Sequence, residues 1–249
     1  MPRIPDERPL RPRPEIVDRL RTLLPAASVL ATSAELAPYE CDGLTAFRQR
    51  PMVVVLPETV EQVQAVLRVC HTARIPVVAR GAGTGLSGGA LPLADGVLLS
   101  LAKFNRILEI DTANCTARVQ PGVRNLAITE AAAPHGLYYA PDPSSQIACS
   151  IGGNVAENAG GVHCLKYGLT TNNVLGLEMV LITGEVIRVG GRHLDSAGYD
   201  ILGLMTGSEG LLAVVTEVTV RILQKPETAR AMLVGFPSNE QAGQCVADI

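Results

Sequence analysis

Two clusters of glycine constrain the fold of this chain more than any other feature of its sequence. The first runs from Arg80 to Gly89 and places five glycines in the nine positions after Arg80. The second, SIGGNVAENAGG, runs from Ser150 to Gly161. Because glycine lacks a Cβ, it permits positive φ angles and a close approach of the backbone to a ligand. A flexible turn does not need so many glycines, so we interpret both clusters as binding loops that together could clamp one long ligand.

The first cluster contains the spacing Gly83-x-Gly85-x-x-Gly88, which matches the dinucleotide fingerprint of Rossmann folds. A Rossmann fold also needs a helix that starts within this motif and directs its N-terminus at the pyrophosphate. Pro92 and the Asp95-Gly96 pair leave no room for that helix. We therefore expect a loop that meets a pyrophosphate with consecutive backbone N–H groups. The side chains that would add charge or hydroxyl donors to it are Arg80, Thr84 and Ser87.

Hydrophobic periodicity around the clusters predicts a chain that mixes helices and strands. Helices are expected over residues 15–24, 60–70, 124–133, 199–205 and 238–249. Strands are expected over 52–56, 75–79, 97–101, 107–111, 115–120, 175–183, 185–189, 214–223 and 231–236. Residues 52–80 then form a β–α–β unit whose helix begins at a capping box of Thr59 and Gln62.

Composition excludes several classes of function. A net charge of −3 offers no basic field for nucleic acid or an anionic membrane, and 3% aromatic residues with no Trp argue against stacking platforms for single strands. The six cysteines are scattered, and no histidine pair has ligand-like spacing, so we expect neither an iron–sulfur cluster nor another metal site. The prolines near the N-terminus interrupt any signal peptide. Together these features predict a cytoplasmic protein with reduced thiols.

Four motifs, in this order along the chain, resemble the FAD-binding domain of the vanillyl-alcohol-oxidase family. They are residues 76–89, residues 149–161, Lys166-Tyr-Gly168 and Gly207-Ser-Glu-Gly210. The likeness extends over about residues 15–249 and is greatest to the D-2-hydroxy-acid dehydrogenase group, which includes FAD-containing subunits of glycolate oxidase. The resemblance implies an α+β fold, a two-lobed PCMH-type FAD-binding domain rather than a Rossmann fold.

The resemblance also implies how the chain divides into domains. Residues 1–47 would form an N-terminal leader and helical segment. Residues 48–226 would form the FAD-binding domain, with lobes at about 50–105 and 106–225. Residues 227–249 would start a truncated substrate or cap domain, because the chain stops inside an expected helix soon after strands and helices have restarted.

The cofactor-binding residues that the resemblance implies fall into four groups. The pyrophosphate would be wrapped by Arg80, Gly81, Ala82, Gly83, Thr84, Gly85, Leu86, Ser87, Gly88 and Gly89. The flavin side would be lined by Asp142, Ser144 and Ser145. The ribityl chain and isoalloxazine would lie along Ser150, Ile151, Gly152, Gly153, Asn154, Asn158, Gly160 and Gly161, with backbone N–H groups facing the ring. The adenine or ribityl side would be completed by Tyr167, Gly168, Glu209, Gly210 and Val215.

The resemblance further implies that FAD is held non-covalently. Members with covalent flavin often carry a histidine at the position that matches Thr84, and threonine cannot form that bond. The implied reaction is hydride transfer to flavin N5 from a small 2-hydroxy acid, either glycolate or D-lactate. Electrons would pass to FAD-like and iron–sulfur partner subunits of a glycolate oxidase complex, and any association with a membrane would be peripheral and made through those partners.

The catalytic residues are not assigned. Relatives place a metal-binding cluster and substrate-binding arginines in a cap half, and those motifs do not occur before Ile249. His163, two residues after Gly161, is the histidine best placed to approach the flavin. Two alternatives stay open: a non-catalytic FAD-binding fragment or assembly module, and a UDP-N-acetylmuramate reductase, which shares the domain but whose substrate residues are not found.

Overall fold

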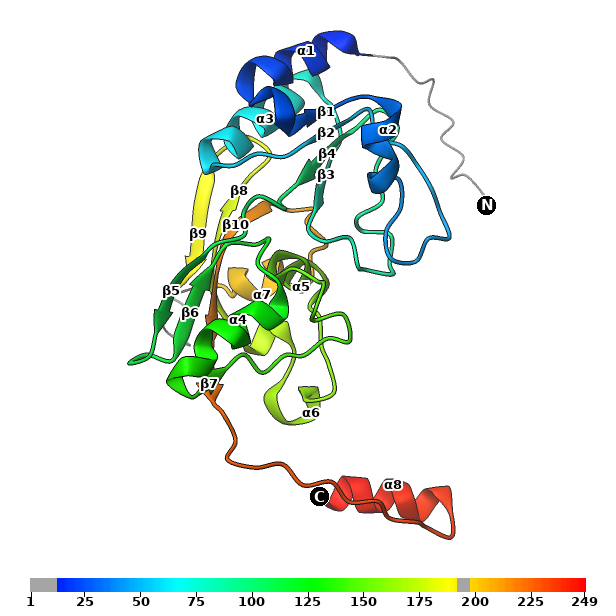
Figure 1. The fold of residues 1–249 in the computed structure, drawn as a ribbon, viewed down its shortest axis with the longest axis vertical. Helices are drawn as coiled ribbons and strands as arrows, with labels where there is room; N and C mark the ends of the chain where they lie inside the picture. The colour runs from blue at the N-terminus through cyan, green and yellow to red at the C-terminus, as the bar shows by residue number, and fades with distance from the viewer. Residues whose placement is uncertain (1–12, 192–197) are drawn as a thin grey trace.

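Two main sheets organise the chain, and the computed structural model describes residues 13–191 and 198–249. The first sheet has four strands in the order β1-β2-β4-β3, and the second has five in the order β5-β6-β10-β8-β9. Figure 1 shows the first sheet and its helices at one end of the molecule and the second sheet beyond it. Residues 1–12 of the expected leader lie outside the described residues.

The first sheet is mostly parallel. Its strands are β1 (Val29–Leu30), β2 (Val53–Val55), β3 (Val77–Arg80) and β4 (Val97–Ser100). Both β2 and β3 run parallel to β4, which lies between them, so the expected β–α–β unit forms with an additional strand inserted. The three valines of β2 are all fully buried, as expected for a parallel strand covered on both faces.

The helices of this lobe pack together on the sheet. They are α1 (Pro14–Leu23), the short α2 (Ser33–Leu36) and α3 (Val60–Ala73). Ile16 and Leu20 of α1 share a core with Val63 and Leu67 of α3. The predicted capping box forms only in half, because Thr59 accepts from the Gln62 N–H while the Gln62 side chain accepts from the N–H of Glu58 instead of Thr59.

The second sheet is antiparallel throughout. Its strands are β5 (Ile107–Asp111), β6 (Thr116–Val119), β8 (Val174–Val180), β9 (Val186–Gly190) and β10 (Val214–Arg221). The strands expected over these residues are confirmed. They pair as two hairpins, β5–β6 and β8–β9, and Gly184 turns the second with a φ of +82°. A further pair joins β7 (Leu137–Tyr138) to β11 (Leu223–Gln224).

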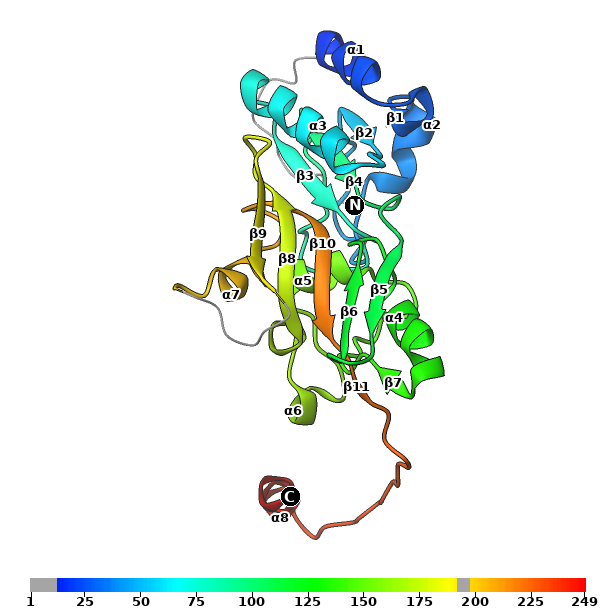
Figure 2. The same ribbon diagram turned by 90° about the vertical axis from the view of Figure 1, so that its left-hand side faces the viewer.

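Three helices pack on the second sheet, and a fourth lies beyond its end. The three are α4 (Asn125–Ala132), α5 (Ile151–Glu157), which belongs to the second glycine cluster, and α7 (Ile201–Met205); the fourth is the short α6 (Cys164–Tyr167). Ile151 and Val155 of α5 share a core with Val218 and Val220 of β10. In Figure 2, α5 lies behind the second sheet, near the end where the first sheet begins. The sheets therefore bring both glycine clusters to the region where the lobes meet.

The expected strand over residues 231–236 is wrong. The segment after β11 has no regular structure until α8 (Asn239–Asp248), the helix expected here, which the Ser238 side chain caps. Met232 is 84% exposed and Leu233 is fully exposed, because no described strand lies beside them to pair with. Figures 1 and 2 both show this segment leading away from the sheets. Within the described residues, no helix has the length and apolar character needed to cross a membrane.

Candidate cofactor site

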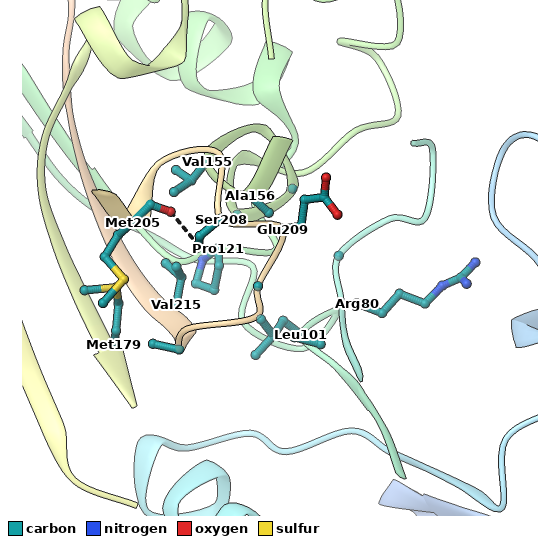
Figure 3. A pocket seen from close by; sticks show the side chains of 16 residues that line it. Arg80, Leu101, Pro121, Val155, Ala156, Met179, Met205, Ser208, Glu209 and Val215 are labelled. Carbon is teal, nitrogen blue, oxygen red and sulfur yellow. Dashed lines mark hydrogen bonds between the residues drawn. The ribbon is translucent and has the colours of Figure 1, made fainter. Parts of the chain in front are cut away.

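A long cleft lies where the two lobes meet. One part has an open volume of about 540 Å³ and a mainly apolar lining that includes Met179, Met205 and Val215 (Figure 3). The adjoining part has an open volume of about 700 Å³ and is lined largely by the two glycine clusters. The residues lining both parts are Ala79, Gly81, Gly153, Ala156 and Glu209. The two parts therefore form one continuous cleft, which suits an elongated ligand.

The first glycine cluster is an open loop between β3 and β4. Residues 81–96 contain neither helix nor strand, which confirms the absence of a Rossmann helix. Gly83 and Gly88 have φ angles of +72° and +84°, a region that glycine adopts without strain. Among the described residues, no hydrogen-bond acceptor lies within reach of the N–H groups of residues 83–85, which line the cleft. Three consecutive free donors are what an anion-binding nest requires.

Arg80 supports this loop from beneath. Its Nη1 donates to the carbonyl oxygens of Cys41 at 2.8 Å and Ala90 at 3.1 Å, and its guanidinium lies over the Tyr39 ring. Arg80 is only 8% exposed, and burial lowers its pKa. Figure 3 shows its side chain directed away from the apolar side chains of the cleft. A Cβ added to Gly83 would collide with the guanidinium, so Arg80 packs directly against the loop at this glycine.

The second glycine cluster contains helix α5, and the Ser150 hydroxyl ties it to the first cluster. Ser150 Oγ accepts from the N–H of Gly153 at 3.4 Å and from that of Ala82 at 3.3 Å. The N–H groups of Ile151 and Gly152 donate to the carbonyls of Val123 and Pro121, both at 2.8 Å. The expectation that these backbone groups face a flavin ring is therefore wrong for residues 151 and 152, because their donors are already used.

The other end of α5 is joined to the loop before β10. Gly207 N–H donates to the Val155 carbonyl at 2.7 Å, and Glu209 N–H donates to the Ala156 carbonyl at 2.8 Å. These bonds satisfy carbonyls that the end of a helix leaves without partners. They also place the side chain of Glu209 in the cleft beside Glu157, the last residue of α5.

The FAD binding domain family matches residues 51–190, more than half of the sequence. This chain belongs to that family. The matched residues include both glycine clusters, which line the cleft, whereas Met205 and the lining residues from 208 to 215 follow the matched range.

Known relatives agree with this membership. The chain is 62% identical over 237 residues to "Glycolate oxidase subunit GlcD" of Escherichia coli (strain K12), which covers 95% of this chain and 48% of the relative. It is 43% identical over 198 residues to "D-lactate dehydrogenase" of Archaeoglobus fulgidus, covering 79% of this chain and 44% of the relative. The solved structure of p-cresol methylhydroxylase with substrate bound matches with a TM-score of 0.74 and 28% identity, covering 86% of this chain and 44% of that one. The chain thus spans about half the length of the curated relatives it matches.

The cleft of this FAD-binding domain fits the shape and chemistry of FAD. No described acceptor occupies the N–H groups of residues 83–85, so this stretch of the cleft wall has free backbone donors. The apolar part offers a surface of Leu101, Val155 and Met179 against which an aromatic ring can pack. An added Cβ on Gly81 would collide with Ser150 Oγ, so this glycine also lets the two clusters approach each other.

The structure brings many, but not all, of the expected site residues to the cleft. Those that line it are Arg80, Gly81, Ala82, Gly83, Thr84, Gly85, Gly89, Ser145, Ser150, Gly152, Gly153, Asn154, Glu209, Gly210 and Val215. Those that line neither part are Leu86, Ser87, Gly88, Asp142, Ser144, Ile151, Asn158, Gly160, Gly161, Tyr167 and Gly168.

Asp142 and His163 face each other instead of the cleft. The Asp142 carboxylate accepts from the His163 backbone N–H at 3.2 Å and lies 2.6 Å from His163 Nδ1. Tyr167 lies nearby, in edge-on contact with Tyr138. Within the described residues, no group of three or more histidine, cysteine or acidic side chains is arranged to hold a metal ion.

Sequence reasoning missed several residues of the cleft. They are Leu101, Pro121, Pro143, Cys149, Met179, Met205, Ala213 and Glu157. The apolar members follow the same periodicity as core residues, so no local signal separates them from the core. Glu157 is different, because a carboxylate between two glycine pairs is a polar side chain within a predicted ligand loop.

Proposed function

We propose that this chain is the FAD-binding half of an oxidoreductase that oxidises a small 2-hydroxy acid, either glycolate or D-lactate. The observation that carries the proposal is the 62% identity to a glycolate oxidase subunit over 95% of this chain. The likeness to a D-lactate dehydrogenase supports the same class of substrate. Substrate preference between the two acids follows the higher identity and favours glycolate.

We further propose the domain division that the sequence suggested. Residues 48–226 carry the FAD-binding cleft, and residues 227–249 start a substrate or cap domain. Residues 1–47 precede the cleft in sequence, but their β1 and α1 pack onto the first lobe. Two facts support the last part: the apolar side chains of Met232 and Leu233 are exposed, and the chain spans about half of its curated relatives. Exposed apolar residues next to a domain boundary are suited to packing against further structure.

The residues of the cleft have distinct roles in binding. The N–H groups of residues 83–85 bind the pyrophosphate, and Arg80 holds their loop in shape. Met179 and Met205 pack against the adenine ring and exclude water from it. Thr84 offers a hydroxyl but no imidazole, so the cofactor is held without a covalent bond. FAD, when bound, supplies the acceptor for the hydride of the substrate. The remaining expected residues, among them Asp142, Ser144, Asn158, Gly160, Gly161, Tyr167 and Gly168, shape the loops around this cleft.

The base and the group that binds the substrate carboxylate are proposed to lie outside these lining residues. Neither part of the cleft has a lysine or histidine in its lining, and its arginine, Arg80, already donates to two carbonyls. A 2-hydroxy acid needs a cation for its carboxylate and a base for its hydroxyl proton. This same observation favours the second candidate function, a FAD-binding module that is not catalytic by itself.

Partners and location follow from the class of protein. The E. coli relative is named a subunit, so we propose that this chain works with FAD-like and iron–sulfur subunits of a glycolate oxidase complex in the cytoplasm. The absence of any closely spaced cysteine pair in this sequence supports placing the iron–sulfur clusters on a partner.

The test is anaerobic mixing of the FAD-loaded protein with glycolate and with D-lactate while the flavin absorbance is followed. This chain alone should keep its colour, and the polypeptide extended by the residues encoded downstream should bleach within seconds. An extended protein that never bleaches with any 2-hydroxy acid would support the non-catalytic module. Rapid bleaching of this chain alone would show that a complete site exists within it, and His163 would be the first residue to mutate.

A further inference from the structure

Three carboxylates gather around the second half of the first glycine loop. Buried Asp42 accepts from the Gly88 N–H at 2.9 Å. On the other side, a Cβ added to Gly89 would lie 2.9 Å from Glu157 Oε1 and 4.0 Å from Glu209 Oε2. Glu157 and Glu209 both line the part of the cleft that also contains residues 83–85. Carboxylates therefore stand beside the donors expected to bind a pyrophosphate.

The backbone holds Glu157 and Glu209 close to each other. The N–H of Glu209 is bonded to the carbonyl of Ala156, next to Glu157, and Glu209 itself is held at a φ of +54°. This is a left-handed conformation that costs a non-glycine residue free energy. Glu157 also ends helix α5, where the helix dipole disfavours a negative charge. Moving the backbone of Glu209 away from Glu157 would break its hydrogen bond to Ala156.

The cleft offers little positive charge to balance the acids. Arg80 is the charged group below the loop, and it is turned toward the carbonyls of Cys41 and Ala90. The hydroxyl of Ser87 lies near Glu157 and acts to lower its pKa. The charged groups that act on Glu157 are Glu209 and Asp42, both acidic, and a dianionic pyrophosphate would add further negative charge.

We propose that Glu157 is a cofactor-binding residue that holds FAD as the neutral acid, so that FAD binding moves one proton from solvent onto this carboxylate. Partial burial first, then the nearby carboxylates of Glu209 and Asp42, already raise the pKa of Glu157, although the hydroxyl of Ser87 opposes them and much of the residue is exposed. A neutral carboxyl group can donate its hydrogen to an anion, whereas an ionised one only accepts. The inference rests on FAD binding and is independent of which substrate is oxidised.

The sign of the pH dependence follows from linkage. Binding an anion beside Glu157 raises its pKa further, so affinity is greatest where the free protein is already protonated. Affinity then falls as pH rises from the pKa of the free protein to that of the complex, by up to about tenfold per pH unit for one coupled proton. Above the pKa of the complex it is constant again.

The experiment is a fluorescence titration of cofactor-free protein with FAD between about pH 5 and pH 8.5. Wild type should lose affinity with rising pH, and Glu157→Gln should bind as wild type does at low pH and keep that affinity throughout. Glu61→Gln, on an exposed residue of α3, is the matched control and should follow wild type. Calorimetry in buffers of different ionisation enthalpy should show proton uptake on binding by wild type and none by Glu157→Gln.

Several outcomes would overturn the proposal. One is a pH slope in Glu157→Gln equal to that of wild type. Another is an FAD affinity that no longer depends on pH in Glu209→Gln but still depends on pH in Glu157→Gln, which would assign the proton to Glu209. A third is a wild-type slope that disappears on adding Mg²⁺ alone, which would show that a cation balances the charge. Calorimetry that detects no proton uptake by wild type would contradict the proposal as well.

Discussion

Replacing individual glycines of the first loop distinguishes two reasons for the glycines: the backbone conformation of the loop and its close approach to the cofactor. Gly83 has a φ of +72°, and an alanine there costs about 1–2 kcal/mol for the left-handed conformation alone. The added Cβ would also collide with the guanidinium of Arg80. Moving that side chain would weaken charged hydrogen bonds to Cys41 and Ala90, each worth about 1.5–3 kcal/mol. We therefore expect Gly83→Ala to destabilise the loop by roughly 2–4 kcal/mol, or about 30- to 700-fold in FAD affinity.

Two neighbouring glycines serve as matched variants. A Cβ on Gly85 would meet Glu157 Oε1 at 3.8 Å, an ordinary contact, and this residue has no positive φ. Gly88 has a φ of +84° but nothing within 4 Å of an added Cβ. Gly85→Ala should therefore leave the thermal stability of the cofactor-free protein unchanged and reduce FAD affinity. Gly88→Ala should show the conformational cost alone, about 1–2 kcal/mol.

The assays are thermal unfolding followed by circular dichroism without FAD, and FAD titration by flavin fluorescence. Gly83→Ala should lower both Tm and FAD affinity by more than Gly88→Ala does. A Gly83→Ala protein that binds FAD as tightly as wild type would refute the assignment of this loop to the pyrophosphate. A Tm loss in Gly85→Ala as large as that in Gly83→Ala would refute the role given to Arg80.

Three further predictions test other parts of the structure. FAD should leave the polypeptide on acid or heat denaturation because Thr84 cannot bond it covalently, and flavin that stays in the protein pellet would contradict this. Arg80→Lys should lower the stability of the cofactor-free protein by about 1–3 kcal/mol, since one ammonium group cannot keep the geometry of both carbonyl bonds, and an unchanged denaturant midpoint would count against it. The hydrogen bond from Lys103, and then its charge, lower the pKa of Glu58 below its ordinary value of 4.5. The Lys103–Glu58 pair therefore stabilises the folded state above pH 4.5, and this stabilisation is lost as pH falls through the lowered pKa. Acid unfolding of Lys103→Met should therefore depend less on pH in this range, and an identical acid profile would show that the pair contributes nothing.

Much of the fold was predictable because its signals are local. The buried run of β2, the apolar stripe of α3 and the turn at Gly184 depend on residues close together in the sequence. The prediction of a strand over residues 231–236 is wrong because a strand also needs a neighbouring strand to pair with, and the sequence of the segment does not show whether one is present. The prediction that the N–H groups of Ile151 and Gly152 face the flavin is wrong for a similar reason, because their acceptors belong to a turn that is distant in the sequence.

The candidate site was predictable as a pair of loops but not as a set of side chains. The glycines marked where a ligand can approach the backbone, and the cleft lies there. The direction of Arg80 depends on carbonyls before and after the loop. The meeting of Glu157 with Glu209 depends on a cap between two remote segments. Such contacts arise only when the chain has folded.

The most direct test of the central claim is to compare FAD with FMN as ligands of the cofactor-free chain. The cleft continues from the glycine loops to the apolar surface around Met179, Met205 and Val215, so the AMP half of FAD should contribute a large share of the binding. We expect one FAD to bind per chain and FMN to bind at least a hundredfold more weakly, and Met205→Lys should reduce that difference. Equal affinity for FMN, or no saturable binding of FAD, would contradict it.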